Sequence, residues 1–588
     1  MTDPPRTDPQ GIPLTSAYWP AVAAGGIRET TIGSVLRYAA VRAPGKTALI
    51  DGNPDRPGRQ WTYARLLADA ERAARALLTR FAPGERVAVW APNSPEWVIL
   101  EFAAALAGLT LVPVNPAYRG EELAHVLGDS AADGLFLAGP ARDGPSPAGP
   151  VPAGPFPAGP FPAGTAQRAV LDELRGELPA LRHVLSLAEW DRFAAAGDTP
   201  AALRRPLPDV TPLGTAMILY TSGTTGNPKG AVLTHRGLTN NARLAFEAGG
   251  IGPGDVEINP MPLFHVGGSV LFTLGPVQVT ATQVLMSRFS PAVELELIEA
   301  HRVTLLCGVP TMLLALLGHP DLARRDVSSL RRVLTGGAVS PPALARQVED
   351  ALGVTYMIGF AQTEAGCVIS LGTAADQADD RAETMGRPLP HAEARIASLR
   401  TGETARCGEV GEICARGYLV MRGYLNAPEA TAAAVDADGW LHTGDLGSMD
   451  ERGYLRIAGR LKEMIIRGGE NIYPREIEEV LIAHPAVADA SVLGVPDDYY
   501  GEVVGAAIRI RPATASSPGG ASPHGDDGDA SDLSGDRLIA ELAAYCRGRL
   551  TPEKVPARWL ITDAFPMTPS GKIRKDDLRA QLTQAPPG

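Results

Sequence analysis

The segment 220–230 combines residue types that bind phosphate. It reads Tyr-Thr-Ser-Gly-Thr-Thr-Gly-Asn-Pro-Lys-Gly and lies between two apolar runs, 216–219 and 231–233. This pattern predicts a strand, a loop and a second strand. The glycines let the backbone turn and present its N–H groups, the hydroxyls add donors, and Lys229 adds a positive charge, which suits a polyphosphate. The loop is not a Walker A loop, because Gly230 follows the lysine where that motif has Ser or Thr; a solvated turn is the alternative.

Six more motifs follow this loop along the chain. They are Gly336-Gly-Ala338, Gly359-Phe-Ala-Gln-Thr-Glu364, Gly439-Trp-Leu-His-Thr-Gly-Asp445, Gly459-Arg-Leu-Lys-Glu463, Gly468-Gly-Glu-Asn471 and Pro569-Ser-Gly-Lys572. In this order the series resembles the adenylate-forming enzymes, a family that includes acyl-CoA synthetases, aryl-CoA ligases, the adenylation domains of peptide synthetases and firefly luciferase. The resemblance extends from about Thr31 to Arg579, nearly the whole chain.

The resemblance implies roles for the residues of the larger, N-terminal part. The phosphate loop would hold the nucleotide through Thr221, Ser222, Gly223, Thr224, Thr225 and Lys229. Phe360 would stack on adenine, Thr363 would contact the α-phosphate, and Glu364 would bind Mg²⁺, a hard cation that prefers oxygen ligands. Gly337 would line the pocket and let the substrate pass close to the backbone. Ala361 stands where many members have glycine, and its methyl group narrows the site.

Other roles fall nearer the C-terminus. Asp445 would grip both ribose hydroxyls, since a carboxylate accepts two hydrogen bonds at once. Arg460 would contact ribose or phosphate, and Lys462 occupies the hinge position. Lys572 would be the catalytic lysine that bridges a carboxylate and the α-phosphate. Gly468, Gly469 and Glu470 would face the channel that holds the pantetheine of CoA.

His265 has two interpretations of equal weight. In the resemblance it borders the acyl pocket near the reacting carboxylate and counts among the catalytic residues. A lone histidine in an apolar segment is as often a core residue whose ring is already hydrogen-bonded.

The composition limits the class of protein. The chain has 588 residues, enough for several domains, and a net charge of −12, which disfavours a nucleic-acid or anionic-membrane surface. The five cysteines lack metal-site spacing and fit a reducing compartment. The N-terminal residues lack an apolar signal core. The run 266–287 is free of charge, but its glycines, proline and glutamines favour a buried strand pair over an integral membrane segment. We expect a cytoplasmic protein.

The alternation of apolar strand patterns with amphipathic helix patterns along the chain predicts an α/β fold with largely parallel sheets. Strands are expected at 86–91, 303–307, 332–334 and 355–359, with a helix at 95–107. We expect an N-terminal AMP-binding domain over 1–459, a hinge at 460–463 and a small mobile α+β domain over 464–588. In the small domain a helix is expected at 474–483, with strands at 490–495 and 503–510. A Pro-x-Pro-Ala-Gly repeat at 145–164 and a low-complexity segment at 513–534 are expected to be insertions outside the packed cores.

These features predict an ATP- and Mg²⁺-dependent carboxylic acid–CoA ligase that forms acyl-AMP, releases pyrophosphate and then AMP. A medium- or long-chain fatty acid is the leading substrate class and an aryl acid the second. The alternatives are a stand-alone adenylation enzyme that loads a carrier-protein thiol and an inactive nucleotide-binding regulator; a luciferase-like oxygenase is more remote. A carrier protein and a second copy of the chain in a homodimer stay open as partners.

Overall fold

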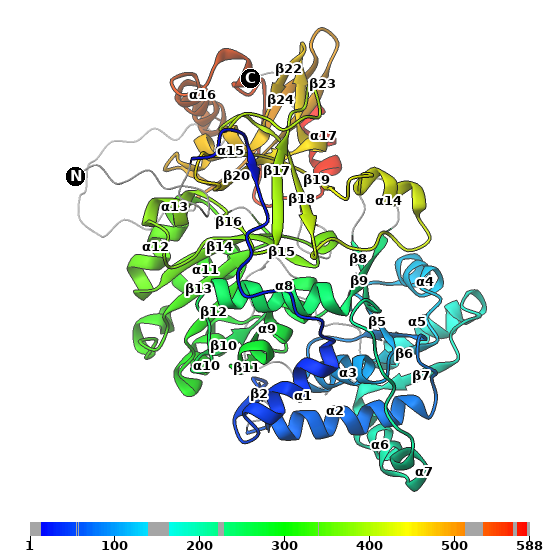
Figure 1. The fold of residues 1–588 in the computed structure, drawn as a ribbon. Coiled ribbons are helices and arrows are strands. Elements are labelled where there is room, and N and C mark those ends of the chain that lie inside the picture. Colours follow the sequence, from blue (N-terminus) through cyan, green and yellow to red (C-terminus); the bar gives the residue numbers. More distant parts are fainter. Residues whose placement is uncertain are drawn as a thin grey trace. The chain divides into compact units, whose positions relative to one another are not determined.

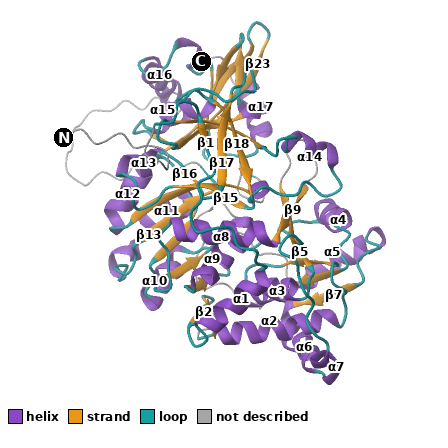
Figure 2. Cartoon of the chain, in the orientation of Figure 1, coloured by secondary structure: helices purple, strands orange, loops and turns teal. Residues whose placement is uncertain are grey.

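The computed structural model describes residues 13–54, 56, 58–138, 164–221, 228–338, 340–511, 533–567 and 573–584. Contacts between Cα atoms divide the chain into two units. The larger comprises Met1–Glu409, Ile413–Thr443 and Met449–Arg456, and the smaller Val410–Glu412, Gly444–Ser448 and Ile457–Gly588. Helices and strands alternate through most of the larger unit (Figures 1 and 2), as an α/β fold requires.

A six-stranded sheet in the larger unit has the order β7-β6-β4-β5-β8-β9. Its pairs are parallel except for the terminal β8–β9 hairpin, which is antiparallel. The strands are β4 (Arg86–Trp90), β5 (Thr110–Pro113), β6 (Gly134–Leu137), β7 (His183–Ser186), β8 (Thr215–Thr221) and β9 (Lys229–Thr234). The expected strand at 86–91 is confirmed as β4, and the two strands predicted on either side of the phosphate loop are confirmed as β8 and β9.

A nine-stranded sheet has the order β16-β15-β14-β13-β12-β10-β11-β2-β3. Its centre is parallel, while β15, β16 and β3 join antiparallel at the two ends. The strands are β2 (Thr47–Asp51), β3 (Gln60–Thr62), β10 (Val256–Asn259), β11 (Thr282–Leu285), β12 (Leu305–Gly308), β13 (Arg332–Gly336), β14 (Thr355–Gln362), β15 (Cys367–Leu371) and β16 (Arg387–Pro388). The predicted strands 303–307, 332–334 and 355–359 correspond to β12, β13 and β14.

Several helices of the larger unit begin at a residue whose side chain caps them. Before α3 (Pro95–Leu106), Ser94 accepts a hydrogen bond from the Trp97 N–H, and Pro95 occupies the first helical position. Every residue of α3 is buried, and all but Glu96 and Glu101 are apolar. The remaining α-helices of this unit are α1 (Ile32–Arg42), α2 (Tyr63–Leu78), α4 (Gly120–Asp129), α5 (Gly164–Leu174), α6 (Trp190–Ala195), α7 (Pro200–Arg204), α8 (His235–Ala248), α9 (Phe272–Val279), α10 (Pro291–His301), α11 (Pro310–Leu317), α12 (Pro342–Leu352), α13 (Ala378–Glu383) and α14 (Pro428–Ala434).

The prediction of a buried strand pair at 266–287 is wrong. This run forms a π-helical turn (Gly267–Leu271), then α9, and only then the strand β11. Its side chains are almost all buried, and a buried helix has no polar face from which its period could be read. Gly275 lets α9 approach α8, because a Cβ there would lie 2.2 Å from the Phe246 ring. No described helix combines the length and apolar character needed to cross a membrane.

A third sheet has the order β1-β17-β18-β19-β20, and the division between the units passes through its last three strands. The strands are β1 (Tyr18–Trp19), β17 (Ala392–Ala397), β18 (Gly411–Gly417), β19 (Leu441–Met449) and β20 (Leu455–Arg460).

The smaller unit is an α+β domain. Its sheet has the order β22-β21-β24-β23, and β25 pairs parallel with β24. The elements are β21 (Ile465–Arg467), β22 (Glu470–Ile472), α15 (Pro474–Ile482), β23 (Val487–Asp497), β24 (Gly501–Ile510), α16 (Leu533–Arg547), β25 (Arg558–Ile561) and α17 (Lys575–Gln584). The expected helix at 474–483 and strands at 490–495 and 503–510 are confirmed as α15, β23 and β24. The repeat at 145–164 and nearly all of 513–534 lie outside the described residues.

Candidate active site

The predicted phosphate-binding sequence includes the end of β8 and the start of β9, two strands that pair antiparallel. Thr221 at the end of β8 lies opposite Lys229 at the start of β9, so the two predicted nucleotide contacts are cross-strand neighbours. The residues that join them, among them Ser222, Gly223, Thr224 and Thr225, lie outside the described residues.

One helix holds both arms of this hairpin. The Tyr220 hydroxyl donates to Asp129 of α4 over 2.7 Å, and the His125 ring of the same helix lies 2.8 Å from the Pro228 carbonyl oxygen. Figure 1 shows α4 beside β8 and β9. The residues on either side of the predicted loop are therefore anchored to one rigid element.

Glu364, the predicted Mg²⁺ ligand, is buried beside this hairpin. It follows β14 in a single 3₁₀ turn (Thr363–Ala365) and is 8% exposed. Its Oε1 accepts a 2.7 Å hydrogen bond from the Tyr424 hydroxyl, and the Thr221 hydroxyl lies at 3.5 Å, the outer limit of such a bond. The Met421 N–H donates to the Glu364 carbonyl oxygen over 2.8 Å. The structure thus brings Thr221 and Glu364 together from distant parts of the sequence.

Tyr424 also contacts Lys229. The Lys229 Nζ lies 5.5 Å from the centroid of the Tyr424 ring, within the range of a cation–π interaction. Burial, followed by the charge of Glu364, raises the pKa of Tyr424 above its ordinary value of 10.0. The phenol therefore stays protonated and acts as a donor to the carboxylate. Tyr424 thus contacts both the positive side chain of Lys229, which suits phosphate oxygens, and the negative side chain of Glu364, which suits a cation.

The ends of β13 and β14 bring further predicted residues close to one another. Gly336 pairs with Gly359 across the two strands, and a Cβ on Gly336 would lie 2.7 Å from the Gly359 carbonyl oxygen. Gly337 follows with φ of 74°, a left-handed conformation that favours glycine. Phe360 is buried, 7% exposed, in β14. Thr363 begins the turn that carries Glu364.

His265 lies just before the π-helical turn. Its ring centroid is 4.4 Å from that of Phe264, and its carbonyl oxygen accepts hydrogen bonds from the Ser269 N–H and hydroxyl, both at 3.0 Å. The side chain is half-buried. Both interpretations of His265, pocket residue and core residue, remain predictions.

In the smaller unit, Asp445 and Arg460 form an ion pair. The Arg460 Nε lies 3.1 Å from Asp445 Oδ1, with the carboxylate 13% and the guanidinium 49% exposed. Lys462 is in the 3₁₀ turn that follows (Leu461–Glu463), and burial together with the charge of Arg460 lowers the pKa of Lys462 below its ordinary value. The two predicted ribose contacts therefore lie together.

The predicted pantetheine loop is a tight turn between β21 and β22. Gly468 and Gly469 have φ of 58° and 91°, and the Gly468 N–H donates to the Tyr500 carbonyl oxygen over 2.8 Å. Glu470 opens β22 and is exposed. Lys572 lies outside the described residues.

Sequence reasoning missed Tyr424. No motif singled it out, because it reaches the site through tertiary pairing with β9 rather than through a recognisable loop. No local signal marks Tyr424, which lies four residues before Pro428, the first residue of α14.

Comparison with known proteins identifies the group to which this site belongs. The profile of the AMP-binding enzyme family matches residues 36–425, and that of the AMP-binding enzyme C-terminal domain matches residues 476–572. YngI of Bacillus subtilis (strain 168) is 38% identical over 95% of this chain and 98% of its own length. The mitochondrial medium-chain acyl-CoA ligase ACSF2 of Homo sapiens is 34% identical over 95% of this chain and 88% of its own. The ATP-bound RpMatB–BxBclM chimera B1 shares the fold with a TM-score of 0.80 and 27% identity, covering 95% of this chain and 99% of that one.

The fold and these matches define an adenylate-forming enzyme. The chain belongs to the AMP-binding enzyme family.

Proposed function

We propose that the protein is an ATP- and Mg²⁺-dependent carboxylic acid–CoA ligase that works through an acyl-AMP intermediate. The observation that carries this proposal is the Lys229–Tyr424–Glu364 cluster beside the β8–β9 hairpin, in a chain of the AMP-binding enzyme family. The Lys229 ammonium can bind phosphate oxygens of the nucleotide, and the buried Glu364 carboxylate can bind its magnesium ion. Tyr424 contacts both groups.

In the first step a carboxylate oxygen of the acid attacks the α-phosphorus of ATP. The bond from that phosphorus to the bridging oxygen breaks, and pyrophosphate leaves with the electron pair. Two anions must meet, so catalysis consists of positioning and charge neutralisation. Lys229 would hold phosphate oxygens, Thr363 the α-phosphate and Phe360 the adenine, while Lys572 would bridge the two reacting anions.

The residues present fit a magnesium ion. Glu364 offers a buried carboxylate whose Oε1 is already oriented by Tyr424 and Thr221, and hard oxygen ligands of this kind, completed by phosphate oxygens, suit Mg²⁺. When bound, the ion neutralises phosphate charge.

In the second step the CoA sulfur attacks the acyl carbon. The bond from that carbon to the phosphate oxygen breaks, AMP leaves with the electron pair, and the thiol proton is released. We propose that the 460–463 segment, with Lys462 at its centre, is the hinge between a domain over 1–459 and a domain over 464–588. The small domain would present Lys572 in the first step and the Gly468-Gly469-Glu470 turn to pantetheine in the second. Asp445 and Arg460, which already lie together, would hold the ribose.

A medium- or long-chain fatty acid is the proposed substrate, supported by the name of the human relative ACSF2. An aryl acid is the second candidate. The proposed compartment is the cytoplasm, supported by the five cysteines, all within the described residues, between which no disulfide forms. A homodimer remains a prediction.

The main alternative is an enzyme that passes the acyl group to a carrier-protein thiol. To decide, a panel of fatty and aryl acids is incubated with Mg·ATP, with and without CoA, and pyrophosphate and thioester are measured separately. The ligase proposal expects acid-dependent pyrophosphate in both arms and acyl-CoA at micromolar to millimolar CoA. If acyl-AMP forms and a carrier protein consumes it while CoA does not, the result favours the alternative. If no acid-dependent pyrophosphate forms at all, the result favours an inactive nucleotide-binding protein.

A further inference from the structure

Among the described residues of this site, Tyr424 contacts two predicted ligand-binding side chains of opposite charge. Its hydroxyl donates to Glu364 Oε1 over 2.7 Å, and its ring lies 5.5 Å from the Lys229 ammonium. We infer that Tyr424 is a positioning residue that orients the metal-binding carboxylate through its hydroxyl and the phosphate-binding ammonium through its ring. This inference rests on the proposed function and deepens it.

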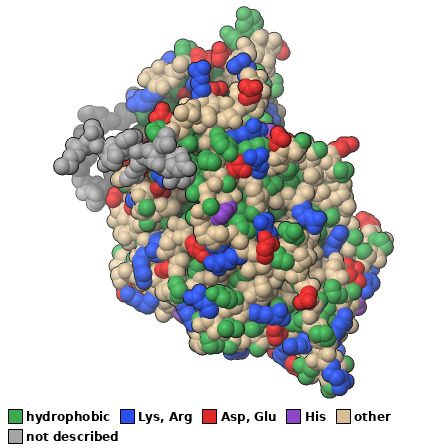
Figure 3. Space-filling view, viewed as in Figure 1, with side chains coloured by type: hydrophobic (Ala, Val, Ile, Leu, Met, Phe, Trp, Pro, Cys, Tyr) green, Lys and Arg blue, Asp and Glu red, His purple; other side chains and the backbone are tan. Residues whose placement is uncertain are grey.

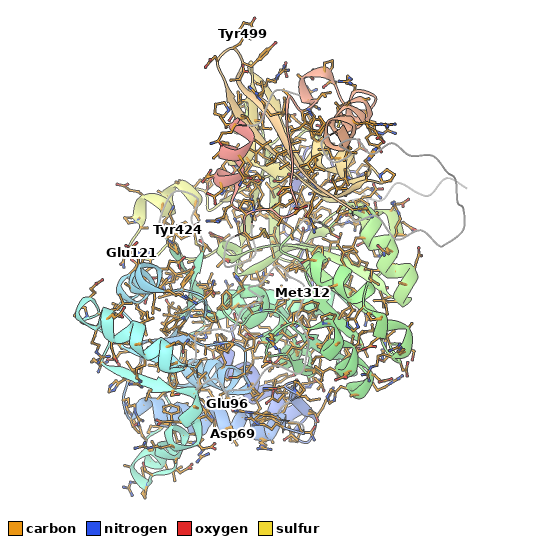
Figure 4. The ribbon with its side chains drawn as sticks, turned by 180° about the vertical axis from the view of Figure 1, so that it is seen from behind. Asp69, Glu96, Glu121, Met312, Tyr424 and Tyr499 are labelled. Carbon is orange, nitrogen blue, oxygen red and sulfur yellow. The ribbon has the colours of Figure 1, made fainter. Side chains whose placement is uncertain are left out.

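The backbone around Tyr424 is fixed on both sides. Its N–H donates to the Thr431 hydroxyl of α14 over 2.8 Å. The flanking residues extend the hairpin: Arg422 donates to the Val232 carbonyl, and Leu425 to the Gly230 carbonyl, over 2.9 and 2.8 Å. Tyr424, labelled in Figure 4, therefore stands on a short strand-like segment beside β9.

A rigid support matters because Lys229 and Glu364 have long side chains. Holding such chains in one geometry costs rotamer entropy, and a site is precise only where neighbouring packing fixes those rotamers. Glu364 is 8% exposed, so an unpartnered carboxylate there would also carry a desolvation cost. The Tyr424 hydroxyl supplies a hydrogen bond to a charged acceptor, which is stronger than a neutral one.

The two contacts of Tyr424 can be separated by substitution. Tyr424→Phe removes the hydroxyl and keeps the ring over Lys229, while Tyr424→Leu removes both. The first should impair only the part of ATP binding that depends on Mg²⁺, and the second should also impair binding of ATP without metal.

Tyr454 provides a matched control. Its hydroxyl donates to Asp376 over 2.5 Å, and the Arg387 guanidinium lies 4.5 Å from its ring centroid. The same combination of phenol, carboxylate and cation thus occurs at residues with no predicted role in the site. Tyr454→Phe should leave ATP binding unchanged with and without Mg²⁺.

The test is calorimetric titration of ATP into the folded variants, once with Mg²⁺ and once with EDTA. Tyr424→Phe should weaken Mg·ATP binding about tenfold or more, the size expected for a hydrogen bond to a charged group, and leave metal-free ATP binding within about twofold of the parent. Tyr424→Phe combined with Glu364→Gln should bind no more weakly than Glu364→Gln alone, because the hydroxyl acts through that carboxylate.

If Tyr424→Phe lost ATP affinity equally with Mg²⁺ and with EDTA, or lost none in either titration, the positioning role would be overturned while the ligase proposal stayed intact. Additive losses in the double variant would do the same. A parent chain that binds ATP in neither arm would instead refute the proposed function, so the two failures are distinguishable. Circular dichroism and thermal melts establish that each variant is folded; a Tyr424→Phe chain that does not fold would contradict the inference, since it would make the hydroxyl a structural group.

Discussion

Glu294 should make the stability of the larger unit fall as pH rises. The side chain lies in α10, is 2% exposed, and its Oε1 has no hydrogen-bond partner among the described residues. Burial raises the pKa of Glu294 to about 8 from an ordinary value of 4.5. Between these values the unfolded chain has released the proton and the folded chain has kept it. Each pH unit in that window then lowers the free energy of unfolding by about 1.4 kcal/mol.

The substitution that isolates this effect is Glu294→Gln, a neutral side chain close in shape to the protonated acid. Below pH 4.5 the parent and the variant should be about equally stable. Above that value the free energy of unfolding of the variant should exceed that of the parent, by up to about 5 kcal/mol near pH 8. This upper bound follows from the difference of about 3.5 between the two pKa values. The buried Glu257, whose pKa is also raised, remains in both proteins and largely cancels in the comparison.

Urea unfolding of both proteins at several pH values between 5 and 8.5, in the window set by the two pKa values, gives this difference directly. Glu296→Gln on the same helix is the control: that carboxylate is 54% exposed in an ion pair with Arg325, and such pairs contribute about 0–1 kcal/mol. A parent–variant difference that stays flat across the range would show that Glu294 is not held neutral by burial, and the argument would fail.

Two further predictions concern catalysis and the site's framework. Lys572→Ala should lose acid-dependent pyrophosphate exchange by several orders of magnitude and still convert supplied acyl-AMP and CoA to thioester. Lys462→Pro should keep pyrophosphate exchange and lose thioester formation, because proline fixes φ at the hinge. Equal loss of both half-reactions in both folded variants would contradict domain alternation. Gly336→Ala should weaken ATP binding and lower the melting temperature, since its Cβ would lie 2.7 Å from the Gly359 carbonyl oxygen, backbone that cannot swing aside; unchanged binding and melting would show that the two strand ends separate easily.

Local patterns were enough to predict much of the fold. The apolar run that became β4, and the Ser94-Pro95 start of α3, are signals contained within a few residues. The same holds for the β8–β9 hairpin, where the turn residues mark the point of reversal. The face of the molecule in Figure 3 has basic and acidic side chains interspersed over its described residues.

The failures have a physical origin in long-range packing. The first part of the 266–287 run is helical, and Gly275 of α9 packs against Phe246 of α8, a complementarity that no local pattern contains. Tyr424 was missed because its role depends on pairing with Ala231, far earlier in the chain, and on a carboxylate from a third segment. The roles of Asp445, Arg460 and Lys572 came from the family resemblance and remain predictions.

An isotope transfer experiment tests the central claim most directly. The acid is supplied with ¹⁸O in both carboxyl oxygens, together with Mg·ATP and CoA, and the AMP and thioester are analysed by mass spectrometry. If a carboxylate oxygen attacks the α-phosphorus and the thiol then attacks the acyl carbon, each AMP must carry one ¹⁸O atom and each thioester must retain one. Unlabelled AMP formed together with acyl-CoA would contradict the acyl-adenylate mechanism.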